Sequence, residues 1–298
     1  MFLQTLFPSE GGTVFAAGTA PTASTTVIVG NAAPTVSAVV LNNAASITLT
    51  ANATTAVNVN ATITDNNGCS DITGGTITIM IYRSAITSST CLTTSSDLNC
   101  YRATAFTASS TCASNAQNTT TTFAVQYFAQ ATDASSSFAA QNWLATVVFK
   151  DTSNATGTAD STGVELLTLT ALNITTSSIN YGTLSASSTT GSVNQVATST
   201  NAGNSSTTLQ LSVNAALTSG ANSLATSTTQ TYSTSTFTFQ GTSTFITGSP
   251  VTVSGFFLTS PTSTTNVSQP TFWGLTVPAG IATGTYNGVN LFTSLFQV

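Results

Sequence analysis

Residues 57–82 read VNVNATITDNNGCSDITGGTITIMIY and contain two segments in which apolar and polar residues alternate. Apolar side chains occupy every second position of residues 57–63 and of residues 77–81, and Asn or Thr fills most positions between them. Successive side chains of a strand point to opposite faces of a sheet, so both segments are predicted to be strands with one buried face. Between them, Asn66-Asn67-Gly68 and Gly74-Gly75 are typical of turns.

The same alternation recurs along the rest of the chain. It is found in residues 123–127, 143–149, 209–213, 237–239, 251–253 and 273–277. β-Branched residues, which suit a pleated sheet, are abundant throughout, and long windows of helix-favouring residues do not occur. Strands separated by short turns predict an all-β protein, with two tandem Ig-like antiparallel β-sandwich domains and an extended N-terminal arm.

The length of 298 residues suits two domains. We predict an arm over residues 1–30, a first sandwich over residues 31–163 and a second sandwich over residues 164–298. The boundary is placed after DTSNATGTADSTG, residues 151–163, because small polar residues favour connections over strands. All four cysteines and all three basic residues precede this boundary.

Charged residues make up only 4% of the chain. The three basic residues, Arg83, Arg102 and Lys150, cannot form a cationic patch, so nucleic acid is not an expected partner. A low charge density also removes the repulsion that normally keeps copies of a protein apart, which favours self-association. No run of 18 consecutive apolar residues occurs, so no transmembrane segment is predicted.

The four cysteines are separated by 22, 9 and 12 residues, and the chain has no histidine. This spacing does not match the short Cys pairs of zinc sites and favours disulfides formed in an oxidising compartment. Three pairings are possible, of which we favour Cys91–Cys100 together with Cys69–Cys112. Closing these loops would stabilise the fold by about 2.7 and 4 kcal/mol respectively.

The absence of histidine excludes Ser–His–Asp and Cys–His catalysis. The pair Asp65 and Asp71 has the residue types of a glycosidase, but the interpretation favoured here is that both serve the turn between the strands. Asp65, Asp71, Asp151 and Asp160 are also weak candidates for calcium ligands, although the loop lacks EF-hand spacing. The sequence therefore predicts no cofactor, no bound metal and no enzymatic activity.

Each predicted sandwich contains one tryptophan, Trp143 or Trp273, within an alternating segment. We interpret both as core residues packed between two sheets, the ordinary position of a strand tryptophan. The alternative is an exposed aromatic platform that binds sugars.

Several stretches resemble secreted Ig-like surface proteins of candidate-phyla (Patescibacteria) bacteria. They include VNATITDNNGCSDITGGTITIMIYRS, FAVQYFAQATD, NWLATVVFKD, GVELLTLTALNITTSSINYGTL and WGLTVPAGIATGTYNGVNLF. The resemblance covers most of residues 31–298. It implies export, β-sandwich modules and a place in the cell envelope or outside the cell, and it implies no chemistry.

The arm is apolar and has no Lys or Arg. Its large apolar side chains are Phe2, Leu3, Leu6, Phe7, Val14, Phe15, Val27, Ile28 and Val29. Burying each would stabilise the protein by roughly 1.5–3 kcal/mol, so the arm is expected to be cleaved, to pack on its own domain, or to join the sheet of a neighbour. It makes a poor complete signal peptide, because it lacks a basic region, although TVFAAGTA resembles the end of one.

The favoured hypothesis is a secreted structural protein that forms a head-to-tail homopolymer, either a pilus-like filament or a surface layer, by strand donation from the arm. The alternative hypothesis is an adhesin or virion spike whose loops recognise surface glycans.

Overall fold

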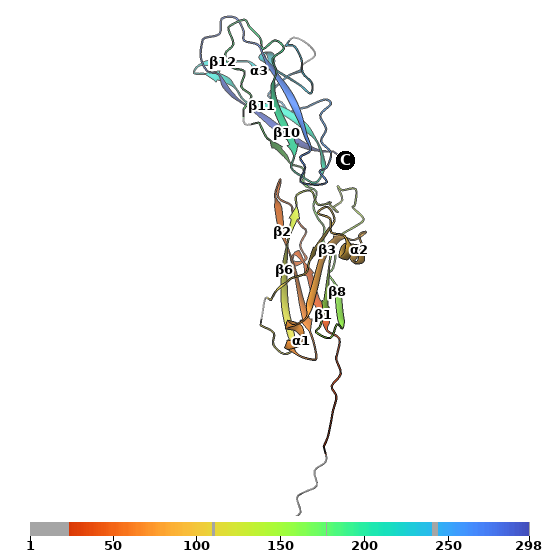
Figure 1. The fold of residues 1–298 in the computed structure, drawn as a ribbon. Helices are drawn as coiled ribbons and strands as arrows, with labels where there is room; N and C mark the ends of the chain where they lie inside the picture. Colours follow the sequence, from red (N-terminus) through yellow and green to blue (C-terminus); the bar gives the residue numbers. More distant parts are fainter. Residues whose placement is uncertain (1–23, 109–110, 177, 240–243, 298) are drawn as a thin grey trace, which may run out of the picture. The chain divides into compact units, whose positions relative to one another are not determined.

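The computed structural model describes residues 24–108, 111–176, 178–239 and 244–297. Of the described residues, 44% lie in strands and 7% in helices. The chain divides into two compact units, Met1–Asn31 and Ala32–Val298. The second unit contains four sheets whose paired strands are all antiparallel, which confirms the predicted all-β sandwich fold (Figure 1).

The first two sheets enclose one apolar core. One sheet has the order β1 (Thr35–Leu41), β2 (Thr54–Thr64), β6 (Ala116–Gln126) and β5 (Thr107–Ala108). The other has the order β4 (Cys100–Ala103), β3 (Thr76–Arg83), β7 (Trp143–Lys150) and β8 (Thr156–Asp160). Between β2 and β3 lies the short helix α1 (Cys69–Thr73), and α2 (Ser88–Thr93) follows β3. A 3-10 turn, η1 (Asn42–Ala44), follows β1.

The other two sheets enclose a second core. One has the order β14 (Thr244–Phe245), β13 (Gln230–Ser233), β16 (Ser268–Leu275), β10 (Gln195–Asn201) and β9 (Leu172–Ile174). The other is built on the long strand β11 (Ser206–Ser219), which pairs with β12 (Asn222–Leu224), β15 (Val251–Thr252) and β17 (Asn287–Gln297). The helix α3 (Thr226–Thr229) precedes β13.

Strand β2 shows how alternation makes a stable sheet without charges. Its apolar residues, from Val57 to Ile63, are buried in the first core. On the opposite face, Thr122 Oγ1 donates to Asn58 Oδ1 across the β2–β6 pair at 2.7 Å. Thr120 Oγ1 donates to Asn60 Oδ1 at 2.8 Å in the same way. Cross-strand hydroxyl–amide pairs of this kind replace the ion pairs that usually cover an exposed face.

Strand β3 differs from its prediction, because both of its faces are buried. Ile77, Ile79 and Ile81 face the first core as expected, but Met80 and Tyr82 are buried as well. These two residues pack with Cys91 and Cys100 in a separate small cluster under α2. The prediction of one exposed face was therefore wrong for β3, because a connecting segment covers it.

Two predicted segments are shorter or absent as strands. Residues 237–239 form no strand, although Phe239 is buried and its N–H donates to Gly191 O at 2.7 Å. Of residues 251–253, only Val251 and Thr252 form a strand, β15. Short alternating stretches do not by themselves find a partner strand, so the pattern overestimates them.

Both tryptophans lie in the cores. Trp143 and Trp273 have no exposed surface. Trp143 Nε1 donates to Gln130 O and Trp273 Nε1 donates to Thr271 Oγ1, each at 2.9 Å. The core interpretation is thus confirmed, and the alternative of an exposed sugar-binding platform is wrong.

Residues 164–171 connect the first core to the second sandwich. Val164 and Leu166 belong to the first core, although the predicted second domain begins at residue 164. The buried Asn204, just before β11, donates from Nδ2 to Ala129 O at 2.9 Å and to Leu167 O at 3.2 Å. Its Oδ1 accepts from Leu169 N at 2.7 Å. The side-chain amide of Asn204 therefore forms hydrogen bonds with Ala129 O in the first core and with Leu167 O and Leu169 N in the connection.

Two tyrosines, the buried Tyr101 and the half-buried Tyr181, predict a loss of stability at alkaline pH. Burial raises the pKa of Tyr101 and Tyr181 well above the ordinary value of 10.0. A pKa raised in the folded state favours folding below the unfolded pKa, and this contribution is lost as pH rises through the folded pKa. The urea midpoint should therefore be constant from about pH 7 to 9 and fall above about pH 10. A midpoint unchanged at pH 11 would contradict this. Burial also raises the pKa of Tyr232, which contributes in the same direction.

Candidate functional site

The described part of the arm exposes its apolar side chains. Val27, Ile28 and Val29 are 82%, 90% and 81% exposed, and residues 24–34 have no regular secondary structure. The other predicted arm residues, Phe2, Leu3, Leu6, Phe7, Val14 and Phe15, lie outside the described residues. The three consecutive β-branched residues are therefore the part of the predicted assembly arm that the structure presents to solvent.

Strand β17 offers an open sheet edge. It pairs with β11 on one side, and no strand pairs with its other side within the described parts of the chain. Its sequence, NGVNLFTSLFQ, contains no charged residue and no proline, the residues that usually protect an edge from pairing with another chain. Val289, Leu291 and Phe296 are exposed on this strand.

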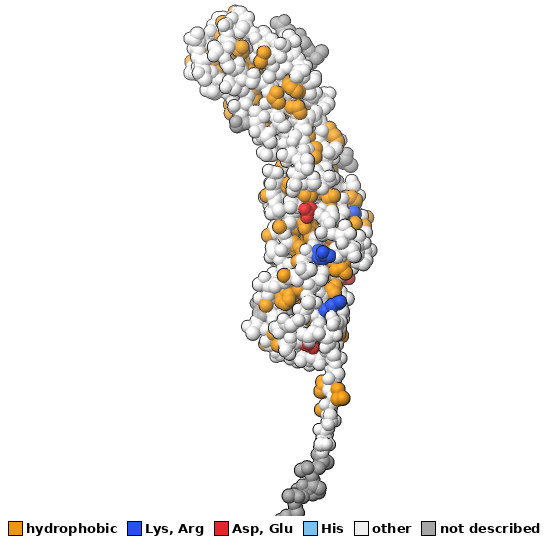
Figure 2. Space-filling view, in the orientation of Figure 1, with side chains coloured by type: hydrophobic (Ala, Val, Ile, Leu, Met, Phe, Trp, Pro, Cys, Tyr) orange, Lys and Arg blue, Asp and Glu red, His pale blue; other side chains and the backbone are white. Residues whose placement is uncertain are grey.

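A cavity lies beside this edge in the second sandwich. Its volume is about 830 Å³, and Ile179, Tyr181, Leu217, Leu275, Val277 and Tyr286 are among its lining residues. A smaller cavity of about 440 Å³ is lined by Val289 and Phe292 of β17 together with Ile174 of β9. Uncharged atoms cover most of the visible surface, and apolar side chains form scattered patches on it (Figure 2). Large exposed apolar side chains are concentrated in the second sandwich. Among the described residues from 32 to 171, Leu92 is the only large apolar residue that is exposed.

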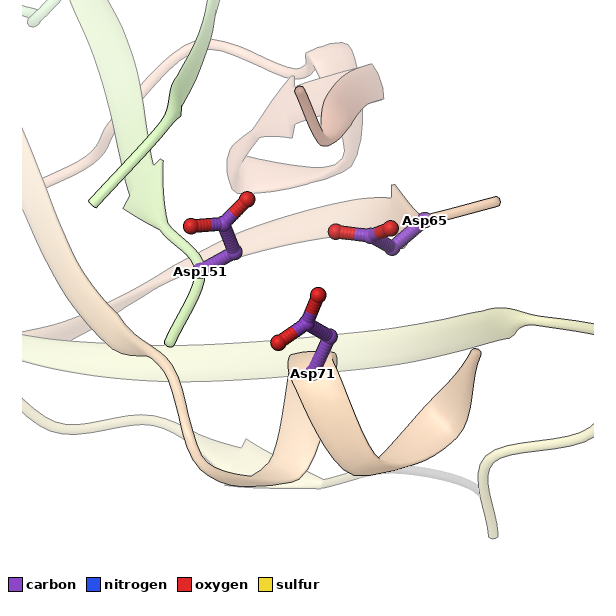
Figure 3. A group of neighbouring side chains, drawn as sticks. All are labelled: Asp65, Asp71 and Asp151. Atoms are coloured by element: carbon purple, nitrogen blue, oxygen red, sulfur yellow. The ribbon is translucent and has the colours of Figure 1, made fainter. Parts of the chain in front are cut away.

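Three carboxylates meet in the first sandwich. Asp65 follows β2, Asp71 lies on α1 and Asp151 follows β7, so the group combines one residue from each sheet with one from the connecting helix (Figure 3). One oxygen atom from each residue lies within 4.8 Å of the others. Before screening by solvent, charges at this distance repel by about 3.5 kcal/mol per pair at an effective dielectric constant of 20.

Asp65 is the most enclosed of the three, with no exposed surface. Its Oδ1 accepts from Asn67 N at 2.8 Å, which forms the turn that the sequence predicts. Its Oδ2 is buried and has no hydrogen-bond partner among the described residues. A buried carboxylate oxygen left without a partner is costly and uncommon in folded proteins.

Asp151 and Asp71 are held by the β7–β8 turn. Asp151 Oδ1 accepts from Ser153 N at 2.9 Å and from Ala155 N at 2.8 Å, and the residue is 4% exposed. Asp71 Oδ1 accepts from Thr152 Oγ1 in the same turn. Gly75, between α1 and β3, lets the chain pass close to the end of β7, because a Cβ there would lie 2.5 Å from Lys150 O.

Asp160 lies apart from this group. It is exposed at the end of β8, and its Oδ1 accepts from Thr146 Oγ1 at 2.5 Å. Of the four acids that the sequence names as weak calcium candidates, the structure therefore brings three together. Asp65 and Asp71 could be paired from the sequence because one turn separates them, whereas the position of Asp151 depends on which strand ends meet.

Both disulfides occur in the first sandwich, Cys69–Cys112 and Cys91–Cys100. They are the two pairs favoured from the sequence. Cys69 begins α1, so the first disulfide fixes the helix that carries Asp71. Cys91, on α2, and Cys100, at the start of β4, are both buried.

One basic residue is used inside the fold. Arg83 is 8% exposed, donates from Nε to Gln130 Oε1 at 2.9 Å and lies 3.8 Å from the centre of the Phe138 ring. Arg102 and Lys150 are exposed. Among the described helices, none is both long enough and apolar enough to span a membrane.

Comparisons with known proteins give limited similarity. No protein-family model matches the chain, and no curated protein matches it. One similar solved structure is the CsuC–CsuE chaperone–tip adhesion subunit pre-assembly complex from archaic chaperone-usher Csu pili of Acinetobacter baumannii. It has a TM-score of 0.38 and 11% identity, over 89% of this chain and 100% of that chain. Dimeric latent PorU from Porphyromonas gingivalis has a TM-score of 0.24 and 10% identity, over 84% of this chain and 24% of that chain. Similarity at this level carries no inference about function.

Proposed function

We propose that this protein is a secreted structural subunit that assembles head to tail outside the cell, by donating its arm to the open edge of β17 in a neighbouring copy. The observation that carries the proposal is the combination of an exposed Val27-Ile28-Val29 segment with an uncharged, unprotected sheet edge in the same chain. The proposed role is mechanical and involves no catalysis.

The chemistry of both surfaces suits strand addition. An added strand gains main-chain hydrogen bonds from the edge, and its alternate side chains gain burial. Val289, Leu291 and Phe296 would lie beside the added strand, and Phe292 lines the adjoining cavity. Because donor and acceptor are different surfaces of one chain, the contact is heterologous and propagates into a filament or a layer.

The two disulfides support the proposed location. Disulfides form and persist in oxidising compartments, such as the space outside the cell. The low charge of the chain supports close packing of copies, because like-charge repulsion between them is weak.

Deletion of residues 1–30 tests the donor. We expect a folded, monodisperse monomer that no longer forms polymers, as measured by size-exclusion chromatography with light scattering and by electron microscopy. Polymers formed by the truncated chain as readily as by the full chain would exclude the arm as the donor.

Leu291→Lys tests the acceptor, because it places a charge on the edge of β17, where Leu291 is 47% exposed. The matched control is Leu92→Lys, which makes the same change at a leucine that is 43% exposed on α2. We expect Leu291→Lys to reduce polymer at least tenfold and Leu92→Lys to leave it unchanged. Equal effects of the two changes would contradict a specific edge. Glycan binding by a chain that never polymerises would support the adhesin hypothesis instead.

A further inference from the structure

We propose that Asp65, Asp71 and Asp151 form a calcium-binding site that joins the two sheets of the first sandwich. The proposal is independent of the assembly described above. It is carried by two observations together, the convergence of three carboxylates and the buried oxygen of Asp65 that has no hydrogen-bond partner among the described residues. Figure 3 shows the three side chains around one space, which the carboxylates of Asp65 and Asp71 face and beside which Asp151 lies.

A cation accounts for both observations. Three carboxylates within 4.8 Å of one another repel, and a divalent cation between them converts the repulsion into attraction. The free Oδ2 of Asp65 would gain a ligand in place of the hydrogen bond that it lacks. The turn accounts only for the other oxygen, Oδ1, which accepts from Asn67 N.

The donor set selects a hard cation. All three side chains offer oxygen, the chain has no histidine, and all four cysteines are in disulfides. Oxygen-only sites suit calcium and magnesium, whereas zinc and copper favour nitrogen and sulfur. Calcium is the better match, because it accepts irregular geometry and completes its shell of six to eight oxygens with backbone carbonyls and water, whereas magnesium demands a near-ideal octahedron.

The site lies where an ion would act on the fold. Asp65 extends β2 of one sheet, Asp151 extends β7 of the other, and Asp71 lies on the connecting helix. Asn67, in the same turn as Asp65, accepts at its Oδ1 from Ala32 N at 2.6 Å, so the turn also holds the first residue of the unit Ala32–Val298. An ion here would fix the sheets, α1 and residue 32 at one end of the first sandwich.

Thermal unfolding of the full chain tests the site. Affinity typical of extracellular calcium modules, with Kd on the order of 10⁻⁴ M, predicts a Tm increase of about 5–10 °C in 10 mM CaCl₂ relative to EGTA. Calcium titration by calorimetry should give one site per chain. No Tm increase and no heat of binding would overturn the proposal, as would an equal response to magnesium alone.

Asp65→Asn distinguishes a metal site from a turn residue, because asparagine keeps the acceptor for Asn67 N and removes one charge. We expect the variant to have a higher Tm than the wild type in EGTA, since one repulsive charge is gone, and to lose the calcium response. Asp71→Asn repeats the test at a half-buried position should Asp65→Asn not fold. The control Asp97→Asn removes an exposed charge outside the cluster and should keep the full calcium response. A calcium response retained in both cluster variants would overturn the proposal.

Discussion

Replacing Asn204 with alanine is expected to lower the free energy of unfolding by about 3–5 kcal/mol. The change removes three hydrogen bonds from a side chain that is 8% exposed, and it leaves Ala129 O, Leu167 O and Leu169 N without their partner. Each buried backbone group that loses its partner costs about 1–3 kcal/mol. The effect is expected to be large because Asn204 joins one backbone group of the first core, at Ala129, to two of the connection, at Leu167 and Leu169.

Urea denaturation followed by tryptophan fluorescence measures this effect, since each core contains one tryptophan. In a Trp143→Phe background, Trp273 reports the unfolding of the second core. In a Trp273→Phe background, Trp143 reports the unfolding of the first core. We expect Asn204→Ala to shift both transitions. Asn173→Ala, at an exposed position on β9, is the matched control and should change the free energy by less than about 0.5 kcal/mol. A similarly small change for Asn204→Ala would show that the junction does not depend on this amide.

Removal of the Cys69–Cys112 disulfide by Cys69→Ser with Cys112→Ser is expected to lower the stability of the first sandwich by about 4 kcal/mol. The bond closes a segment with a sequence separation of 43 residues, which contains β3, β4 and β5. Opening it returns conformational entropy to the unfolded chain. Both half-cystines are partly exposed, so serine adds little penalty of its own.

The same tryptophan backgrounds separate a local effect from a general one. The transition reported by Trp143 should move to lower urea, and the one reported by Trp273 should move less. Reduction of the wild-type bond should reproduce the shift of the double variant. An unchanged Trp143 transition in both cases would show that the loop is constrained by packing without the disulfide.

The strands of the first sandwich were largely predictable, because their faces are determined locally. At Val57, Val59, Ala61 and Ile63 the period of two assigns each side chain to the core, whichever strand lies alongside. The prediction failed at Met80 and Tyr82, because a separate segment, α2, covers the outer face. Their apolar character at outward positions was the available signal. It also failed at residues 237–239, where alternation is too short to select a partner strand.

By itself the sequence determined the β class of this protein, the buried face of most strands, and the confinement of its cysteines to a region small enough to limit their pairing. These properties depend on residues close together in the chain, because the alternation of side chains along a strand assigns each one to a face of the sheet. Only the tertiary structure decided that Asp151 joins Asp65 and Asp71 while Asp160 does not, and that one edge of β17 has no partner strand among the described residues. Strand order controls both outcomes, and it depends on contacts between residues distant in the chain, which no local pattern records.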